Sequence, residues 1–370
     1  MVNEQAIWLL DMAEPHINPQ RTWLAILALL YAGDLDSAVA RCRRLRDDPA
    51  WAGSTRRQEL LTLLQARSSL LTGRSWRAAD MLQSMLDRGT STQSACLVVA
   101  WLIEALVHLG ELDRAHQVLL DSKLAGPLDP DLPDRAHILA ARGALHMASG
   151  RFRHAIDDYM ACGWLLDACF VVNPAVIPWR SRAVFGALGI RRYDLALALA
   201  EEELIAARKW GSPRGIGIAL HAVGVARRDD TSVAVLEEAV ALLAQGHART
   251  EFVQALFDLG TMQIRRQDVT EGRRRLVEAA MVAYECRNVF WEERIRFALE
   301  RLQAPAGASK LTRQEEKIAY LARAGHSNRH IAQMTCLTVR TVEFHLSSVY
   351  RKLSISGRRE LVSALSSVPS

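Results

Sequence analysis

One short pattern recurs along most of the chain. In each copy an apolar segment ends at a break, most often at a glycine. A leucine or an aromatic residue then follows in the better copies, and a small residue stands three positions further on. The copies end, 36 to 41 residues apart, at Ala38, Ala79, Ala115, Ala155, Ala196, Ala234 and Gly272. This period accommodates two helices and a tight turn, so the pattern predicts a series of antiparallel helix pairs.

The residue types explain how each pair would close. A glycine provides a left-handed stop for the first helix, and a small residue lets the second helix approach it. Leucine, alanine and arginine dominate the composition, and β-branched alternation is scarce, so we expect an all-α protein. Over about residues 5–300 the chain resembles tetratricopeptide-type repeats, although its period exceeds their usual 34 residues. Such a solenoid is expected to bind a peptide or small ligand on its concave face, with a purely structural spacer as the alternative.

Motifs of enzymes and of metal sites are missing from the sequence. There is no GxxxxGK[ST] phosphate loop, no HExxH or GxSxG, and no GxGxxG in a strand–helix context. The six cysteines form no CxxC pair, and the histidines have no ligand spacing. We therefore expect neither catalysis nor a bound metal or cofactor. The scattered cysteines are typical of small buried side chains in a reducing compartment.

The most apolar window, residues 159–179, is interrupted by Asp167, Asn173, Pro174 and Pro178. It is too broken for a membrane span and predicts a buried helix followed by a proline-bearing turn. The N-terminus has no basic region followed by an apolar core of signal length. We expect a cytoplasmic protein that does not enter a membrane.

Aromatic residues in this window indicate a candidate ligand pocket in the repeats. Trp164, Phe170 and Trp179 lie close in sequence to Cys162 and Cys169. The remaining tryptophans are expected to pack in the core or between repeats.

The basic charge of the chain is concentrated at its C-terminal end. Residues 308–370 contain ten Lys/Arg and four Asp/Glu, whereas the rest of the chain contains 36 and 37. This excess predicts an anionic partner for the last segment alone. Small residues, a proline and a glycine at 303–310 indicate a short linker. We therefore predict a repeat domain over 1–302 and a separate domain over 311–370.

Four helices are expected in the C-terminal segment. Thr312 and Glu315 form a capping box for the first helix, which ends before Gly325. Ser327 and Thr338 are the predicted N-caps of the second and third helices. The fourth helix follows Ser356 and Gly357. The third helix buries a stripe, spaced by four, three and four residues, formed by Val342, Leu346, Val349 and Leu353.

The opposite face of the third helix combines basic, hydroxyl, acidic and aromatic side chains. It holds Arg340, Thr341, Glu343, Phe344, Ser347, Arg351 and Lys352. An exposed phenylalanine between basic residues is unusual on a solvated helix, but each of these groups has a partner in the DNA major groove. With the preceding helix as a brace, the pattern predicts a helix-turn-helix.

The segment "LTRQEEKIAYLARAGHSNRHIAQMTCLTVRTVEFHLSSVYRKLSISGRRELVSAL" resembles the LuxR/GerE-type DNA-binding domain. The matching residues are Leu311, Thr312, Glu315, Gly325, Ser327, Asn328, Ile331, Ala332, Thr341, Val342, His345, Lys352, Leu353 and Arg358. It departs from the family pattern at Gln314, His330, Thr335 and Ser354.

The resemblance implies that the third helix reads bases and that the fourth pairs two copies on a pseudo-palindromic site. The base contacts are expected from Glu343, Phe344 and Ser347. The phosphate contacts are expected from Ser327, Asn328, Arg329, Thr338, Arg340, Thr341, His345, Arg351 and Lys352. For His345 an internal packing role is the alternative. The dimer contact is expected from Leu361, Val362 and Leu365, for which packing inside the domain is an equal alternative.

The whole architecture resembles the C-terminal half of the large ATP-binding LuxR-type regulators, whose helical repeats precede the same domain. It implies a sequence-specific transcription regulator that binds double-stranded DNA as a homodimer. The repeats would sense a small-molecule or peptide ligand or a protein partner. The alternative is a scaffold whose C-terminal domain docks another regulator and not DNA.

Overall fold

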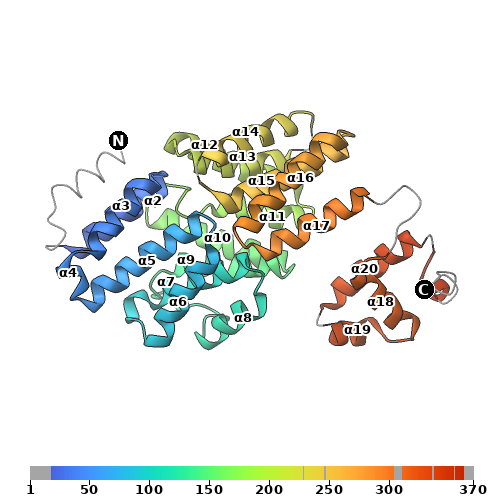
Figure 1. Ribbon diagram of the computed structural model, residues 1–370, viewed down its shortest axis with the longest axis horizontal. Coiled ribbons are helices and arrows are strands. Elements are labelled where there is room, and N and C mark those ends of the chain that lie inside the picture. The colour runs from blue at the N-terminus through green and yellow to red at the C-terminus, as the bar shows by residue number, and fades with distance from the viewer. Residues whose placement is uncertain are drawn as a thin grey trace. The chain divides into compact units, whose positions relative to one another are not determined.

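The computed structural model describes residues 18–227, 229–245, 247–303, 311–335, 337–353 and 355–361 (Figure 1). These residues contain nineteen α-helices and no strand, and the structure is 78% helical, which confirms the all-α prediction. The chain divides into two compact units, Met1–Phe297 and Ala298–Ser370. We call them the repeat unit and the C-terminal unit. The division falls inside the last repeat helix, slightly before the predicted boundary, and residues 304–310 of the predicted linker lie outside the described residues.

The repeat unit consists of antiparallel helix pairs that stack on one another. The pairs are α2 (Pro19–Ala32) with α3 (Leu35–Arg46), α5 (Thr55–Leu71) with α6 (Ser75–Arg88), α7 (Thr92–His108) with α8 (Leu112–Asp121), α9 (Arg135–Ala148) with α10 (Phe152–Ala168), α11 (Trp179–Gly189) with α12 (Tyr193–Trp210), α13 (Pro213–Ala226) with α14 (Ser232–Gln245), and α15 (Arg249–Arg265) with α16 (Val269–Glu285). The short α4 (Pro49–Ala52) follows the first pair, and α17 (Val289–Gln303) follows the last.

The turns between paired helices confirm the predicted left-handed stops. Gly33, Gly73, Gly110 and Gly150 all have positive φ, between 71° and 95°. Where the repeat lacks its glycine, Arg191 (φ 62°) and Gln267 (φ 70°) adopt the same conformation. The weaker repeats therefore keep the same turn geometry. This conformation is strained for Arg191 and Gln267, because the Cβ atom disfavours the left-handed region.

Small residues at the start of the second helix of each pair lie against the first helix. Ala38, Ala115, Ala155 and Ala196 are fully buried. In the last pair the approach is between backbones, because a Cβ atom added to Gly272 would lie 2.6 Å from the carbonyl oxygen of Gly260. This contact explains why the last copy of the pattern ends in glycine.

One predicted anchor, Ala79, is buried but lies one residue beyond the position that the other pairs use, and another, Ala234, is wrong. In the second pair α6 begins at Ser75, so the fourth helical residue is Ala78, which is fully buried, and the repeat starts one residue earlier than predicted. In the sixth pair Ala234 is exposed, and Ser232 and Leu236 are buried in its place. The sequence of this copy has no glycine or aromatic residue to fix the register of its turn.

The array curves until helix pairs far apart in sequence touch. A Cβ atom on Gly73, in the second turn, would lie 2.8 Å from both Arg249 Cβ and Cys286 Sγ of the last pair. The guanidinium of Arg287 stacks over the Trp76 ring, with 4.8 Å between Cζ and the ring centroid. The second helix pair is therefore in direct contact with the seventh.

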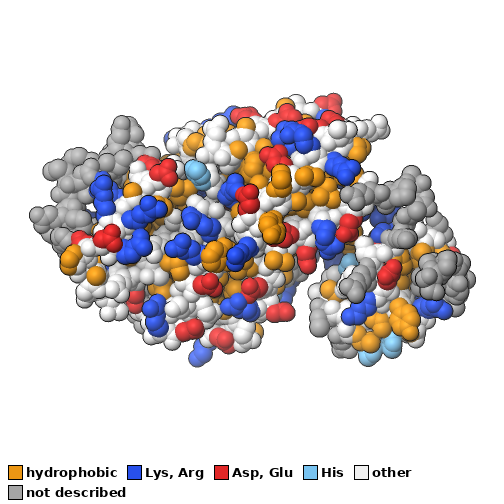
Figure 2. Space-filling view, in the orientation of Figure 1, with side chains coloured by type: hydrophobic (Ala, Val, Ile, Leu, Met, Phe, Trp, Pro, Cys, Tyr) orange, Lys and Arg blue, Asp and Glu red, His pale blue; other side chains and the backbone are white. Residues whose placement is uncertain are grey.

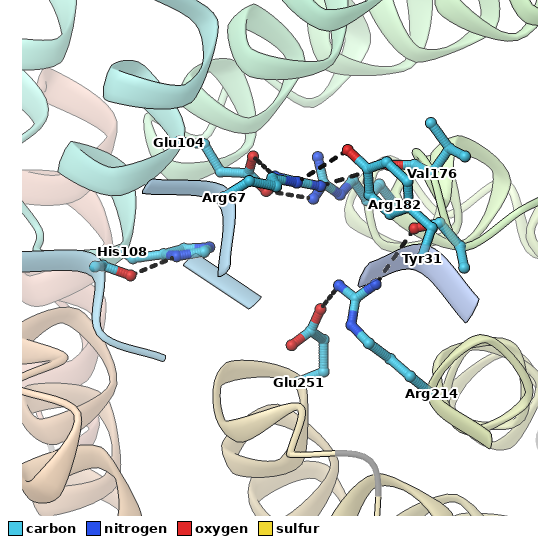
Figure 3. Close-up of polar contacts among 10 residues, drawn as sticks. Tyr31, Arg67, Glu104, His108, Val176, Arg182, Arg214 and Glu251 are labelled. Atoms are coloured by element: carbon cyan, nitrogen blue, oxygen red, sulfur yellow. Dashed lines mark hydrogen bonds and ion pairs between the residues drawn. The ribbon is translucent and has the colours of Figure 1, made fainter. Parts of the chain in front are cut away.

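A buried ionic network joins the first helices of several pairs (Figure 3). The carboxylate of Glu104 on α7 accepts hydrogen bonds from Arg67 Nη1 on α5 and Arg182 Nη2 on α11, both at 2.8 Å. Arg67 Nε also donates to the Tyr31 hydroxyl on α2 at 3.1 Å, and only 3% of the Arg67 side chain is exposed. Burial alone would raise the pKa of Glu104, but the two guanidiniums hold it far below its usual value. Glu104 is therefore ionised, and its negative charge compensates the positive charges of Arg67 and Arg182.

The histidines near this network make stability depend on pH. Burial lowers the pKa of His137, which packs edge-on against Trp101, to about 3. An unfolded histidine binds a proton below pH about 6.5, whereas folded His137 does so only near pH 3. The free energy of unfolding is thus at its full value above pH 6.5 and falls below it, by at most about 1.4 kcal/mol per pH unit for one histidine.

We expect urea unfolding of the protein at pH 7.0 and pH 5.5 to record this loss. His137→Phe keeps an aromatic ring beside Trp101 and should flatten the dependence. His108 contributes to the pH dependence that remains, because burial also lowers the pKa of this histidine. An unchanged slope in the His137→Phe variant would contradict the assignment.

Candidate nucleic-acid interface

The C-terminal unit contains three of the predicted helices around one core. They are α18 (Arg313–Arg323), α19 (Asn328–Thr335) and α20 (Val339–Lys352), followed by a 3₁₀ turn at Arg358–Glu360 (Figure 1). The core is formed by Ile318, Ala319, Leu321, Ala322, Ile331, Ala332, Val342, Leu346, Val349 and Leu361. The predicted buried stripe of α20 is confirmed, with Leu353 only partly buried. Leu361 packs inside this core, whereas Val362 and Leu365 lie outside the described residues.

The predicted caps start each helix. Thr312 and Glu315 form the reciprocal capping box of α18. Ser327 Oγ accepts from the His330 amide at 3.3 Å, and Thr338 Oγ1 accepts from the Thr341 amide at 3.1 Å. Gly325, with φ of +89°, follows the end of α18. α19 and α20 pack against each other as a helix-turn-helix.

A buried carboxylate holds α18 and α20 together. Glu315 is fully buried, and it accepts from the Thr312 amide at 2.8 Å, from Ser348 Oγ at 2.7 Å and from Lys352 Nζ at 2.5 Å. Burial alone would raise the pKa of Glu315, but these hydrogen bonds outweigh it and keep the pKa below its usual value. The sequence indicated only the capping role of Glu315. It assigned Lys352 to phosphate, whereas the structure places this ammonium, 12% exposed, against Glu315.

A second anchor fastens the end of the domain to the turn between α18 and α19. Arg358 donates through Nε to the Ala322 carbonyl at 3.2 Å, and through Nη1 to Asn328 Oδ1 at 3.1 Å. It also donates to the His326 carbonyl. Asn328, predicted to contact phosphate, therefore uses its amide oxygen internally and retains its amide NH₂ as a donor. The sequence identified Arg358 only as a residue shared with the family.

The solvent-facing side of α20 carries most of the predicted DNA contacts. Phe344 is 63% exposed, and Arg340, Glu343, Ser347 and Arg351 are exposed as well. Arg340, Phe344, Ser347 and Arg351 follow helical spacings of four, three and four, which places them along one face. The face thus presents an aromatic ring between two guanidinium groups.

The remaining predicted contacts surround this face. Arg329 is exposed on α19. The hydroxyls of Thr338 and Thr341 lie 2.7 Å apart at the start of α20, and Thr341 is half-buried. His345 is also half-buried, and burial lowers its pKa, so this ring is neutral at pH 7. A neutral His345 supplies a hydrogen bond but no charge to a phosphate.

Residues 309–365 match the protein family described as "GerE: Bacterial regulatory proteins, luxR family". This part of the chain is a LuxR-family helix-turn-helix domain. The match agrees with the helix order, the caps and the buried stripe of the C-terminal unit. None of the described helices of the protein combines the length and apolar content that a membrane crossing requires.

The chain as a whole resembles a solved structure in its fold. The solved structure titled "Crystal Structure of Rap Protein Complexed with Competence and Sporulation Factor" covers 98% of each chain, with a TM-score of 0.57 and 13% identity. At that identity the likeness concerns the fold, and it confirms the tetratricopeptide-like helical repeats. No curated protein matches the chain.

The three aromatic residues of the predicted pocket do not converge. Trp179 is buried and lines a hollow of about 830 Å³ together with Trp210 and Ile205. Trp164 and Phe170, 68% and 88% exposed, are not part of its lining. Cys162 is buried, which raises the pKa of its thiol to about 12. Within the described ranges, no group of His, Cys, Asp and Glu side chains is arranged to hold a metal ion.

Proposed function

We propose that this protein is a sequence-specific DNA-binding transcription regulator that binds a pseudo-palindromic operator as a dimer through α20. The LuxR-family domain suggests a DNA-binding regulator. The proposal that α20 recognises the operator rests on the exposed face of this helix, where Phe344 lies between Arg340 and Arg351. In the major groove, the phenylalanine would meet a thymine methyl and Glu343 would accept from cytosine N4. The arginines would neutralise phosphates.

The repeat unit is proposed to sense a ligand or a protein partner. The Rap protein of similar fold was crystallised in complex with a competence and sporulation factor. Helical repeats present a concave surface suited to peptides and small ligands. We further propose that the protein acts in the cytoplasm, where its DNA target would be.

The proposed recognition face predicts two different effects on DNA binding. Arg340→Ala should weaken binding to all sequences and reduce the slope of log affinity against log salt by about 1, because one phosphate contact is lost. Phe344→Ala should leave that slope unchanged and weaken binding to the operator by about 5- to 30-fold, corresponding to one lost base contact. The operator would come from sequencing of DNA recovered with the intact protein, and affinities from fluorescence anisotropy at several salt concentrations.

The matched control is Lys317→Ala, which removes an exposed positive charge from α18 without touching α20. It should alter affinity much less than Arg340→Ala does. If neither Arg340→Ala nor Phe344→Ala changes DNA binding, α20 is not the recognition helix. If the intact protein and the Phe344→Ala variant enrich no DNA while cellular function persists in both, the scaffold is the correct alternative.

A further inference from the structure

The last helix of the stacked pairs has an apolar seam with no partner in the described residues. On α16, Val277, Met281 and Tyr284 are 43%, 58% and 76% exposed. Their spacings of four and three residues align them along one side of the helix. Figure 2 shows hydrophobic side chains gathered on the visible face of the repeat unit over α15 and α16. The opposite side of α16 is fully buried through Leu276 and Ala279, so α16 has two apolar sides and only one of them is packed.

The charges beside this seam are unevenly distributed along α16. Arg273 and Arg274 lie near its start, and Glu285 is its last residue. Arg273 is exposed and makes no ion pair within the described part of the chain. Arg274 pairs with Glu271 of its own helix. Glu285 is 57% exposed and pairs with Arg249 through Oε2. The seam is therefore basic at one end and acidic at the other.

We propose that α16 packs antiparallel against α16 of a second copy of this chain. With the two-fold axis at the level of Ala279, Val277 of one copy meets Met281 of the other. The same axis places Arg273 opposite Glu285, and Arg274 opposite the Tyr284 ring, which is a favourable cation–π arrangement. A parallel pair would place Arg273 opposite Arg273 and Glu285 opposite Glu285. The apolar and the charged residues thus fit the same axis, as a self-complementary two-fold interface requires.

The inference rests on the proposed function in one respect, because a pseudo-palindromic operator calls for two copies related by a two-fold axis. A single helix pair buries little area compared with the roughly 1,200–2,000 Å² of stable interfaces. The dimer should therefore be weak in solution. It becomes strong when two copies bind neighbouring half-sites, which raises their effective concentration.

Cysteine cross-linking of the full chain tests the orientation directly. The background is Cys169→Ser, which removes an exposed thiol. An equimolar mixture of Val277→Cys and Met281→Cys chains, oxidised with oxidised glutathione, should give a disulfide-linked dimer. Either variant alone should give little, because identical positions lie four residues apart along the antiparallel pair. Equal cross-linking in the single variants and in the mixture would overturn the antiparallel register, and no cross-linking in any sample would overturn the interface.

Sedimentation equilibrium of the uncross-linked protein gives an independent readout. Tyr284→Glu should weaken self-association by roughly tenfold or more, because it places a carboxylate in an apolar interface. The matched control is Ile205→Glu on α12, another exposed apolar residue, at 71% exposure, which should have no effect. Equal effects of the two changes would overturn the proposal. A protein that cross-links through 277 and 281 but binds no DNA would support this surface while contradicting the proposed function.

Discussion

Replacing Glu104 by alanine is expected to lower the free energy of unfolding of the repeat unit by about 4 kcal/mol. This carboxylate is the only partner that Arg67 and Arg182 share in the described network. Its removal leaves two guanidinium groups facing each other, one of them almost completely buried, without a compensating charge. Urea unfolding followed by tryptophan fluorescence measures the change, because Trp101 lies 5.3 Å from the Arg67 guanidinium.

Two further variants make this result interpretable. Glu111→Ala removes a carboxylate from an ion pair whose side chains are 39% and 55% exposed, and should cost less than about 1 kcal/mol. Glu104→Gln keeps the shape and part of the hydrogen bonding, so its cost should fall between the other two. If Glu104→Ala were as mild as Glu111→Ala, the ionic network would not be a major source of stability.

The second large effect is expected in the C-terminal unit. Glu315→Ala removes the capping box of α18 and the partner of both Ser348 and Lys352. Breaking such a buried pair and its cap costs about 3 kcal/mol, which is a large part of the stability of a domain this small. We expect α20 to lose its fixed position and DNA binding to be lost, although Glu315 is buried and so does not itself reach DNA.

Hydrogen exchange measured by mass spectrometry resolves this effect. The C-terminal unit contains no tryptophan, so fluorescence reports only on the repeat unit. Peptides of α18 and α20 should exchange faster in Glu315→Ala, while peptides of the repeat unit should keep their rates. The control is the exposed neighbour, Glu316→Ala, which should leave both sets unchanged. Normal protection of α20 in Glu315→Ala would show that the core alone holds the helix.

The sequence was most informative where structure depends on neighbours along the chain. The left-handed turns at Gly33 and Gly73, the cap at Thr338 and the buried stripe of α20 are local or periodic features, and all are confirmed. The prediction of Ala234 as an anchor was wrong because that copy has no residue that fixes its turn.

Contacts between residues far apart in the chain could not be predicted from the sequence. Glu104 and Arg182 come from different helix pairs, and no periodicity links them. Lys352 has the sequence context of a DNA contact, and only the fold reveals Glu315 beneath it. The tryptophans of the predicted pocket are similarly separated by the orientation of α10, which exposes Trp164 and leaves Trp179 to line the hollow.

The contact of Gly73 with Arg249 and Cys286 determines how many repeats the protein must have. In an open solenoid each repeat touches only its neighbours, so repeats can be gained or lost during evolution with local consequences. Here the insertion or deletion of one helix pair between the second and the seventh pair would shift one of these two pairs by a whole repeat. The two pairs would then no longer meet at Gly73. The contact therefore fits only one number of helix pairs between these two, and the two ends of the array should unfold together and not one repeat at a time.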